Sequence, residues 1–126
     1  MIEIKPVYTT EAIATGAGRN GHVQSADSLV SEDLAIPVAM GGSGKGTNPE
    51  QLFAAGYAAC FHSALQMVAR QAKKSLGDSS VGARVSIGQA GEGFGLAVVL
   101  EVVIPALPHD EAQELADKAH HGCPSS

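Results

Sequence analysis

Residues 48–69 read NPEQLFAAGYAACFHSALQMVA, and this stretch decides the fold. Asn48 is a favourable N-cap, Pro49 suits the first helical position, and Glu50 places a negative charge where the helix dipole favours it. From Leu52 onward the stretch is apolar on nearly every side, which is typical of a helix buried on most of its faces. The chain has only one such segment, and it is rich in alanine. We therefore predict a central core helix and not a membrane span.

Short extended patterns precede this helix and longer ones follow it. Residues 8–15, 22–26 and 29–38 favour extended structure and are separated by turn signals, so they predict an antiparallel meander. Residues 81–88 alternate between apolar and small or polar side chains, and residues 96–104 form a nearly continuous apolar run. Together they predict a β-hairpin, connected through the glycine-rich residues between them.

A second helix is expected near the C-terminus. Asp110 is a candidate N-cap and Gly122 a candidate stop signal. Apolar residues are spaced at i, i+3, i+4 and i+7 on one face: Ala112, Leu115, Ala116 and Ala119. The order of meander, helix, hairpin and helix predicts an α+β fold, and the length of 126 residues fits one domain over residues 1–126.

Charge and composition exclude some classes of function. Lys and Arg number 8 against 13 Asp and Glu, for a formal net charge of −5, and the chain has no Trp, so nucleic-acid binding is not expected. The glycine-rich residues 41–47 lack the spacing of a phosphate-binding loop. The first six residues show no secretory pattern, which predicts a cytoplasmic protein.

The two cysteines, Cys60 and Cys123, match neither a disulfide-rich scaffold nor a CxxC pattern. In a reducing compartment they are either two inert core thiols or a working redox pair. Residues on the same helical face as Cys60 are Phe53, Gly56, Tyr57, Ala64 and Met67, which predicts apolar surroundings. An apolar environment disfavours the thiolate, so a reactive Cys60 needs a cation nearby.

Arg19 is the cation best suited to that task. It lies in a turn between Gly18 and Gly21, where the glycines let the backbone approach closely and the guanidinium stays charged. The alternative is a solvated arginine at the tip of a turn.

A metal site is not predicted. Cys60 and His62 are two positions apart on a helix and point to nearly opposite sides, so they cannot share an ion with His120, His121 or Cys123 without distortion. The two later histidines suit the last turn of the second helix, where the dipole favours positive charge.

Several motifs together resemble one known family. They are Tyr8-Thr9-Thr10, the Gly-Arg-Asn-Gly turn at 18–21, the run at 47–61, Gly93-Phe94-Gly95, and Ala-His-His-Gly-Cys-Pro at 119–124. In this order they span essentially the whole chain and resemble the organic hydroperoxide resistance branch of the Ohr/OsmC family. The resemblance implies an OsmC-like fold and an intertwined homodimer with active sites at the subunit interface.

The resemblance also implies a function and a site. It implies Cys60 as the thiolate that attacks an organic hydroperoxide, Cys123 as the thiol that resolves the product as a disulfide, Arg19 as the stabilising cation and Glu50 as the carboxylate that orients it. It further implies recycling by a dithiol of the lipoyl type and catalysis without a cofactor. Apolar pocket walls would favour alkyl hydroperoxides over hydrogen peroxide, and we expect five residues to line that pocket: Phe53, Gly56, Tyr57, Met67 and Phe94.

Two features stand against a simple transfer of the family site. Glu50 and Cys60 are ten positions apart, about 15 Å on a straight helix and on different faces. Either the helix breaks, with Gly56 as the favoured point, or another chain completes the site of Glu50. Relatives continue with Cys-Pro-Tyr-Ser and a further strand, whereas this chain reads Cys123-Pro124-Ser125-Ser126, so we expect that strand to be absent and Cys123 to be loosely held.

A non-catalytic function is the alternative. On the same scaffold, the apolar pocket around Cys60 would hold an apolar ligand as a stress-related binding module. A slowly reacting Cys60 would favour this alternative.

Overall fold

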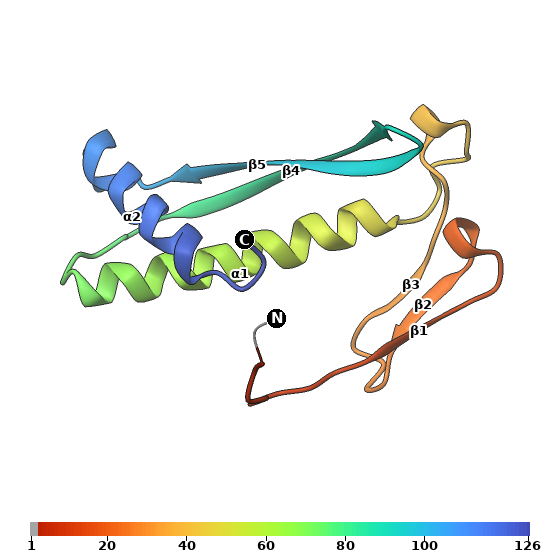
Figure 1. The fold of residues 1–126 in the computed structure, drawn as a ribbon, viewed down its shortest axis with the longest axis horizontal. Coiled ribbons are helices and arrows are strands. Elements are labelled where there is room, and N and C mark those ends of the chain that lie inside the picture. Colours follow the sequence, from red (N-terminus) through yellow and green to blue (C-terminus); the bar gives the residue numbers. More distant parts are fainter. Residues whose placement is uncertain (1–2) are drawn as a thin grey trace. The chain divides into compact units, whose positions relative to one another are not determined.

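The computed structural model describes residues 3–126; residues 1 and 2, the start of the segment without a secretory pattern, lie outside the described residues. The strands and α-helices follow the order predicted from the sequence, and two short 3-10 helices, η1 and η2, were not predicted. The elements are (Figure 1): β1(Ala12–Thr15), η1(Gly18–Asn20), β2(His22–Ser25), β3(Ser31–Asp33), η2(Val38–Met40), α1(Pro49–Gln71), β4(Ser80–Ala90), β5(Gly93–Val103) and α2(His109–Gly122). The chain forms two compact units, Met1–Pro49 and Glu50–Ser126, and each is described by itself.

The N-terminal unit contains the predicted antiparallel meander. β1 pairs with β2 and β2 with β3, with Thr15 opposite His22 and His22 opposite Asp33. All three strands are shorter than predicted, β2 by one residue and the other two by more. β1 begins at Ala12 because its partner β2 ends at Ser25, and a strand extends only as far as its partner. β3 ends at Asp33, and Pro37 then precedes the short helix η2.

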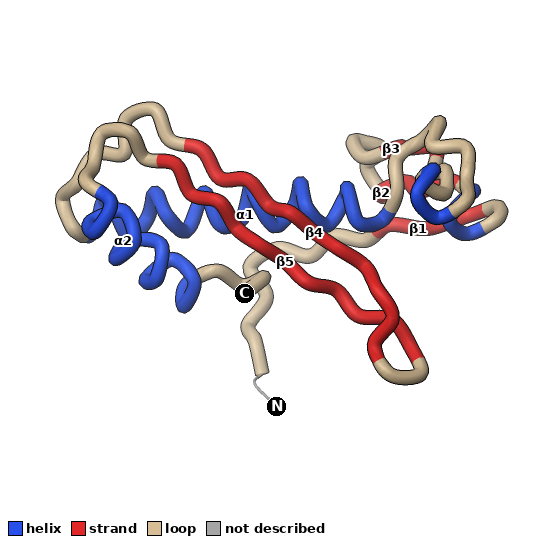
Figure 2. The backbone as a smooth tube through the Cα atoms, turned by 90° about the horizontal axis from the view of Figure 1, so that it is seen from above, coloured by secondary structure: helices blue, strands red, loops and turns tan. Residues whose placement is uncertain are grey.

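The C-terminal unit is built on α1. Both views show the β4–β5 hairpin along this helix, with α2 beside the other two elements near one end (Figure 1, Figure 2). The predicted start of the helix at Pro49 is confirmed. Its core-facing residues recur every three or four positions, and the buried ones are Tyr57, Phe61, Ala64, Leu65 and Ala69.

The prediction that α1 is buried on most of its faces is wrong within this chain. A single stripe is buried, because the β4–β5 hairpin and α2 supply the core on one side only. Phe53 and Met67 remain exposed on other parts of the helix. By length and composition alone α1 is also apolar enough to cross a membrane, with 28% of its most apolar window buried.

The hairpin is longer than predicted. β4 and β5 pair over their whole length, from Ser80 opposite Val103 to Ala90 opposite Gly93. Only Gly91 and Glu92 connect them, and Gly91 takes the left-handed conformation (φ 59°) that such a tight turn requires. Gly93-Phe94-Gly95 therefore belongs to β5 and not to the connection.

The second helix is also present, with ends that differ from the prediction. Its N-cap is Pro108, so Asp110 lies in the first turn and acts there through its charge and not as the cap. Gly122 is the last helical residue, and the C-cap is Cys123. Leu115 and Ala119 are buried on the predicted core face. The antiparallel sheets and two helices confirm the α+β fold class.

Candidate active site

The two cysteines, 63 positions apart in sequence, lie side by side in the C-terminal unit. Their Sγ atoms are 3.4 Å apart, within hydrogen-bonding distance, and both residues are free thiols. Cys60 lies near the middle of α1 and is half-buried, whereas Cys123 is only 4% exposed. A small movement would bring the two sulfurs to the ~2.05 Å of a disulfide bond.

Backbone capping fixes the position of Cys123. Its N–H donates to the carbonyl oxygen of Ala119 at 2.9 Å, which closes the last turn of α2. Ala119 is fully buried, and Cys123 belongs to the same hydrophobic core. The expectation that Cys123 is loosely held is therefore wrong, because the buried face of α2 anchors the residue that caps it.

Beyond Cys123 the chain folds back on itself. The N–H of Ser126 donates to the carbonyl oxygen of Cys123 at 3.1 Å, which closes a tight turn over residues 123–126. The hydroxyl of Ser126 lies 2.8 Å from the phenolic oxygen of Tyr57. The sequence predicts Tyr57 as a wall of the pocket but does not predict the contact of its hydroxyl with Ser126, because no local pattern connects residues 69 positions apart.

This turn also affects the ionisation of Cys123. Burial raises the pKa of its thiol, but hydrogen bonds with the backbone N–H of Ser125, with the Cys60 thiol and with the Ser126 hydroxyl and backbone N–H outweigh burial. The net result is a pKa of Cys123 below its ordinary value. Its thiolate, the nucleophilic form, therefore persists to lower pH than that of an ordinary cysteine.

The predicted pocket residues lie in different environments. Tyr57 is buried and its ring contacts that of Phe53, with centroids 5.7 Å apart. Gly56 and Met67 are exposed on α1, and Phe94 is 73% exposed near the hairpin turn. A separate cavity of about 260 Å³ between β5 and α2 is lined by Phe61, Val102 and His120, among others, and by neither cysteine.

The remaining two predicted site residues lie in η1 and at the start of α1. Arg19 is half-buried in η1 of the N-terminal unit, and Glu50 is the second residue of α1. The helix runs through Gly56 without interruption, so the suggested break there is wrong. Along a continuous helix Glu50 stays about 15 Å from Cys60. The other alternative, that Glu50 completes a site with a second chain, stays a prediction.

The histidines and cysteines of the described residues form no metal site. Among residues 3–126, no cluster of three or more His, Cys, Asp and Glu side chains could hold a metal ion. His62 bonds instead to Ser79 Oγ at 2.9 Å, and His120 and His121 lie in the last turn of α2.

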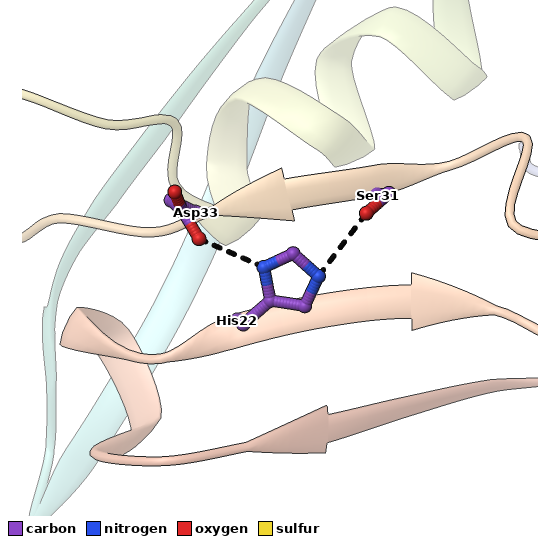
Figure 3. Close-up of polar contacts among 3 residues, drawn as sticks. All are labelled: His22, Ser31 and Asp33. Carbon is purple, nitrogen blue, oxygen red and sulfur yellow. Dashed lines mark hydrogen bonds and ion pairs between the residues drawn. The ribbon is translucent and has the colours of Figure 1, made fainter.

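His22 in the N-terminal unit has partners on the neighbouring strand (Figure 3). Its Nδ1 lies 2.8 Å from Asp33 Oδ1 and its Nε2 lies 3.2 Å from Ser31 Oγ. The order of atoms is that of a Ser–His–Asp relay, but a relay needs a carboxylate shielded from water, and the Asp33 side chain is 93% exposed. These contacts serve to connect β2 to β3.

Comparisons with known proteins show which family this chain belongs to. Residues 42–126 match the family described as OsmC-like protein. The organic hydroperoxide resistance protein of Xanthomonas axonopodis pv. citri is 49% identical over 124 residues, covering 97% of this chain and 87% of the relative. OhrB of Bacillus subtilis, an organic hydroperoxide resistance protein, is 42% identical over 122 residues, covering 95% of this chain and 88% of the relative.

Solved structures agree with this result. An organic hydroperoxide resistance protein from Legionella pneumophila superimposes with a TM-score of 0.91 at 52% identity, covering 97% of this chain and 89% of that one. A protein from Vibrio cholerae described in the same terms, with captopril bound in one of its active sites, gives a TM-score of 0.90 at 48% identity, covering 98% and 85%. Both sequence and structure thus confirm the resemblance that the short motifs indicate, and the chain belongs to the OsmC/Ohr family, among the organic hydroperoxide resistance proteins.

Proposed function

We propose that this protein is a thiol-dependent peroxidase that reduces organic hydroperoxides to alcohols. The observation that carries the proposal is the pair of free thiols 3.4 Å apart, one half-buried on α1 and one buried at the end of α2. Two inert core thiols have no need to lie in contact, whereas the sulfur atoms of a redox pair must come close enough to form a disulfide. The family's role in organic hydroperoxide resistance supplies the substrate class.

The proposed reaction has two steps. The Cys60 thiolate attacks the outer oxygen of the hydroperoxide, the O–O bond breaks, and the alkoxide takes a proton and leaves as an alcohol. Cys60 becomes a sulfenic acid. Cys123 then attacks the Cys60 sulfur as a thiolate; an S–S bond forms, the S–O bond breaks, and hydroxide leaves as water after protonation. A dithiol, of the lipoyl type that the family resemblance implies, reduces the disulfide and restores both thiols.

The apolar character of α1 supports the proposed choice of substrate. Phe53, Tyr57 and Met67 give the helix an apolar surface on and around the face that carries Cys60. Alkyl hydroperoxides bury apolar area there and hydrogen peroxide does not. We propose that a second copy of this chain covers part of this surface, and that the dimer acts in the cytoplasm, without a cofactor and without binding nucleic acid or membranes.

The test is a coupled assay with dihydrolipoamide and an alkyl hydroperoxide, with hydrogen peroxide as the comparison substrate. We expect turnover with the alkyl hydroperoxide at a clearly higher kcat/KM. Failure to consume either peroxide, together with tight binding of an apolar probe, would instead establish the non-catalytic binding module.

We propose that the Arg19 guanidinium stabilises the Cys60 thiolate and the negative charge that develops on the leaving oxygen. Glu50 is proposed to orient that guanidinium. Arg19→Ala should lower kcat/KM for the alkyl hydroperoxide by about a hundredfold, as removal of one transition-state donor does elsewhere. In a Cys123→Ser background it should also slow the alkylation of Cys60 at neutral pH, because the guanidinium no longer favours the charged, nucleophilic form of the thiol.

Arg84→Ala is the matched control for Arg19→Ala. Arg84 is exposed on β4 and has no place in the proposed site, so its removal should leave both measurements unchanged. Equal behaviour of the two variants would remove Arg19 from the mechanism.

A further inference from the structure

The turn after Cys123 contains a contact that the proposed reaction does not yet use. Tyr57 is buried on α1, three residues and almost one helical turn before Cys60, and its hydroxyl lies 2.8 Å from the hydroxyl of Ser126. Ser126 itself is exposed, three residues after Cys123. This one hydrogen bond thus connects the helix that carries Cys60 to the turn that follows Cys123.

The turn and the thiol pair form a closed loop of contacts. Cys123 N–H is bonded to Ala119 at one end of the turn, and Ser126 N–H is bonded back to the carbonyl oxygen of Cys123. Tyr57 holds the far end of the turn, and the two sulfurs meet 3.4 Å apart. A turn fixed at both ends keeps its donors directed at one place, whereas a turn fixed at one end can move away from the thiol pair.

We propose that Tyr57 is a positioning residue for disulfide closure, acting through the Ser126 hydroxyl to hold the turn at 123–126 so that Cys123 attacks Cys60. This inference rests on the proposed function and deepens it. The step it assists is the attack of the Cys123 thiolate on the Cys60 sulfenic acid, in which the S–S bond forms and hydroxide leaves.

Two physical effects favour closure when the turn is held. The first is geometric, because the attacking sulfur stays within 3.4 Å of its target and little ordering remains to be done in the transition state. The second is electrostatic. The donors that lower the pKa of Cys123 come from Ser125 and Ser126, so a loosened turn would also lose part of the thiolate.

The first test measures closure separately from peroxide chemistry. Reduced protein is converted at Cys60 to a mixed disulfide with the coloured thiol 2-nitro-5-thiobenzoate, and release of that thiol reports the attack of Cys123. Ser126→Ala and Tyr57→Phe should each slow release by about fivefold to tenfold, the size expected for loss of one hydrogen bond. The pH midpoint of the Ser126→Ala rate should lie above that of the wild type, because one donor to the thiolate is gone.

The double variant decides whether the two residues act together. If both act through one bond, Tyr57→Phe with Ser126→Ala should be no slower than either single variant. Tyr8→Phe is the matched control, since Tyr8 is exposed in the N-terminal unit and should leave the rate unchanged. Wild-type release rates in both single variants, or multiplicative slowing in the double variant, would overturn the proposal.

The second test uses the hydroperoxide itself. With one equivalent of substrate, Ser126→Ala should consume it at the wild-type rate but form the disulfide more slowly, and with excess substrate it should accumulate more Cys60 sulfinic acid. An equal sulfinic fraction in variant and wild type would count against the inference. If wild-type protein consumes no hydroperoxide, the proposed function fails, whereas the coloured-thiol assay still judges the role of Tyr57.

Discussion

Replacing Cys60 by serine is expected to abolish reduction of alkyl hydroperoxides, with a fall in kcat of about a thousandfold or more, since a serine hydroxyl at neutral pH does not replace a thiolate. The measurement is the dihydrolipoamide-coupled assay under conditions in which the wild type turns over. The variant should fold normally, because the side chain is only partly buried and oxygen differs little from sulfur in shape.

Cys123→Ser is the informative partner of that variant. Because Cys60 remains, it should still consume one equivalent of hydroperoxide per chain to form the sulfenic acid and about one more as Cys60 is over-oxidised to the sulfinic acid, and then stop. Mass spectrometry should find sulfenic or sulfinic acid on Cys60 and no disulfide. Sustained turnover by Cys60→Ser would refute the peroxidase mechanism; sustained turnover by Cys123→Ser would show that another thiol resolves Cys60.

Leu65→Ala is expected to be the most damaging single change to stability. Leu65 is 0% exposed and lies at the centre of the core that joins α1 to the hairpin and α2. Truncating such a leucine removes buried methyl groups and leaves a cavity, which costs about 3 to 4 kcal/mol of the free energy of unfolding. Loss of helical circular dichroism in a urea titration, repeated at several protein concentrations, measures the effect.

Leu96→Ala provides a control of the same chemistry. Leu96 on β5 is 52% exposed, so its truncation should cost less than about 1 kcal/mol. If Leu65→Ala and Leu96→Ala lowered the free energy of unfolding equally, the hydrophobic core around Leu65 would not be the main source of the protein's stability.

Local patterns in the sequence were enough for most of the fold. The Asn48-Pro49-Glu50 start, the apolar run behind it, and the alternation over residues 81–88 each express short-range physics, namely capping, helical periodicity and strand periodicity. The errors lie at element ends. Strand length in the meander depends on the partner strand, and the caps of α2 depend on how its first and last turns pack, which no local pattern contains.

The burial of α1 was a different kind of error. Its apolar residues surround the helix, and the sequence alone does not say which neighbours cover them. In the folded chain only the side facing the hairpin and α2 is covered. The hydrophobic pattern shows which faces of a helix can be buried. Which of those faces are buried depends on the elements that pack against them in the tertiary structure.

The sequence by itself determined the fold class, the position of Cys60 on a long apolar helix, and, through its motifs, the family. Only the tertiary structure decided that Cys123 is buried against Cys60, that the turn after it lowers the pKa of its thiol, and that Tyr57 bonds to Ser126. The physical reason is distance along the chain. Helix and strand signals act over a few residues, whereas the thiol pair joins positions 63 residues apart and forms only when α2 packs against α1.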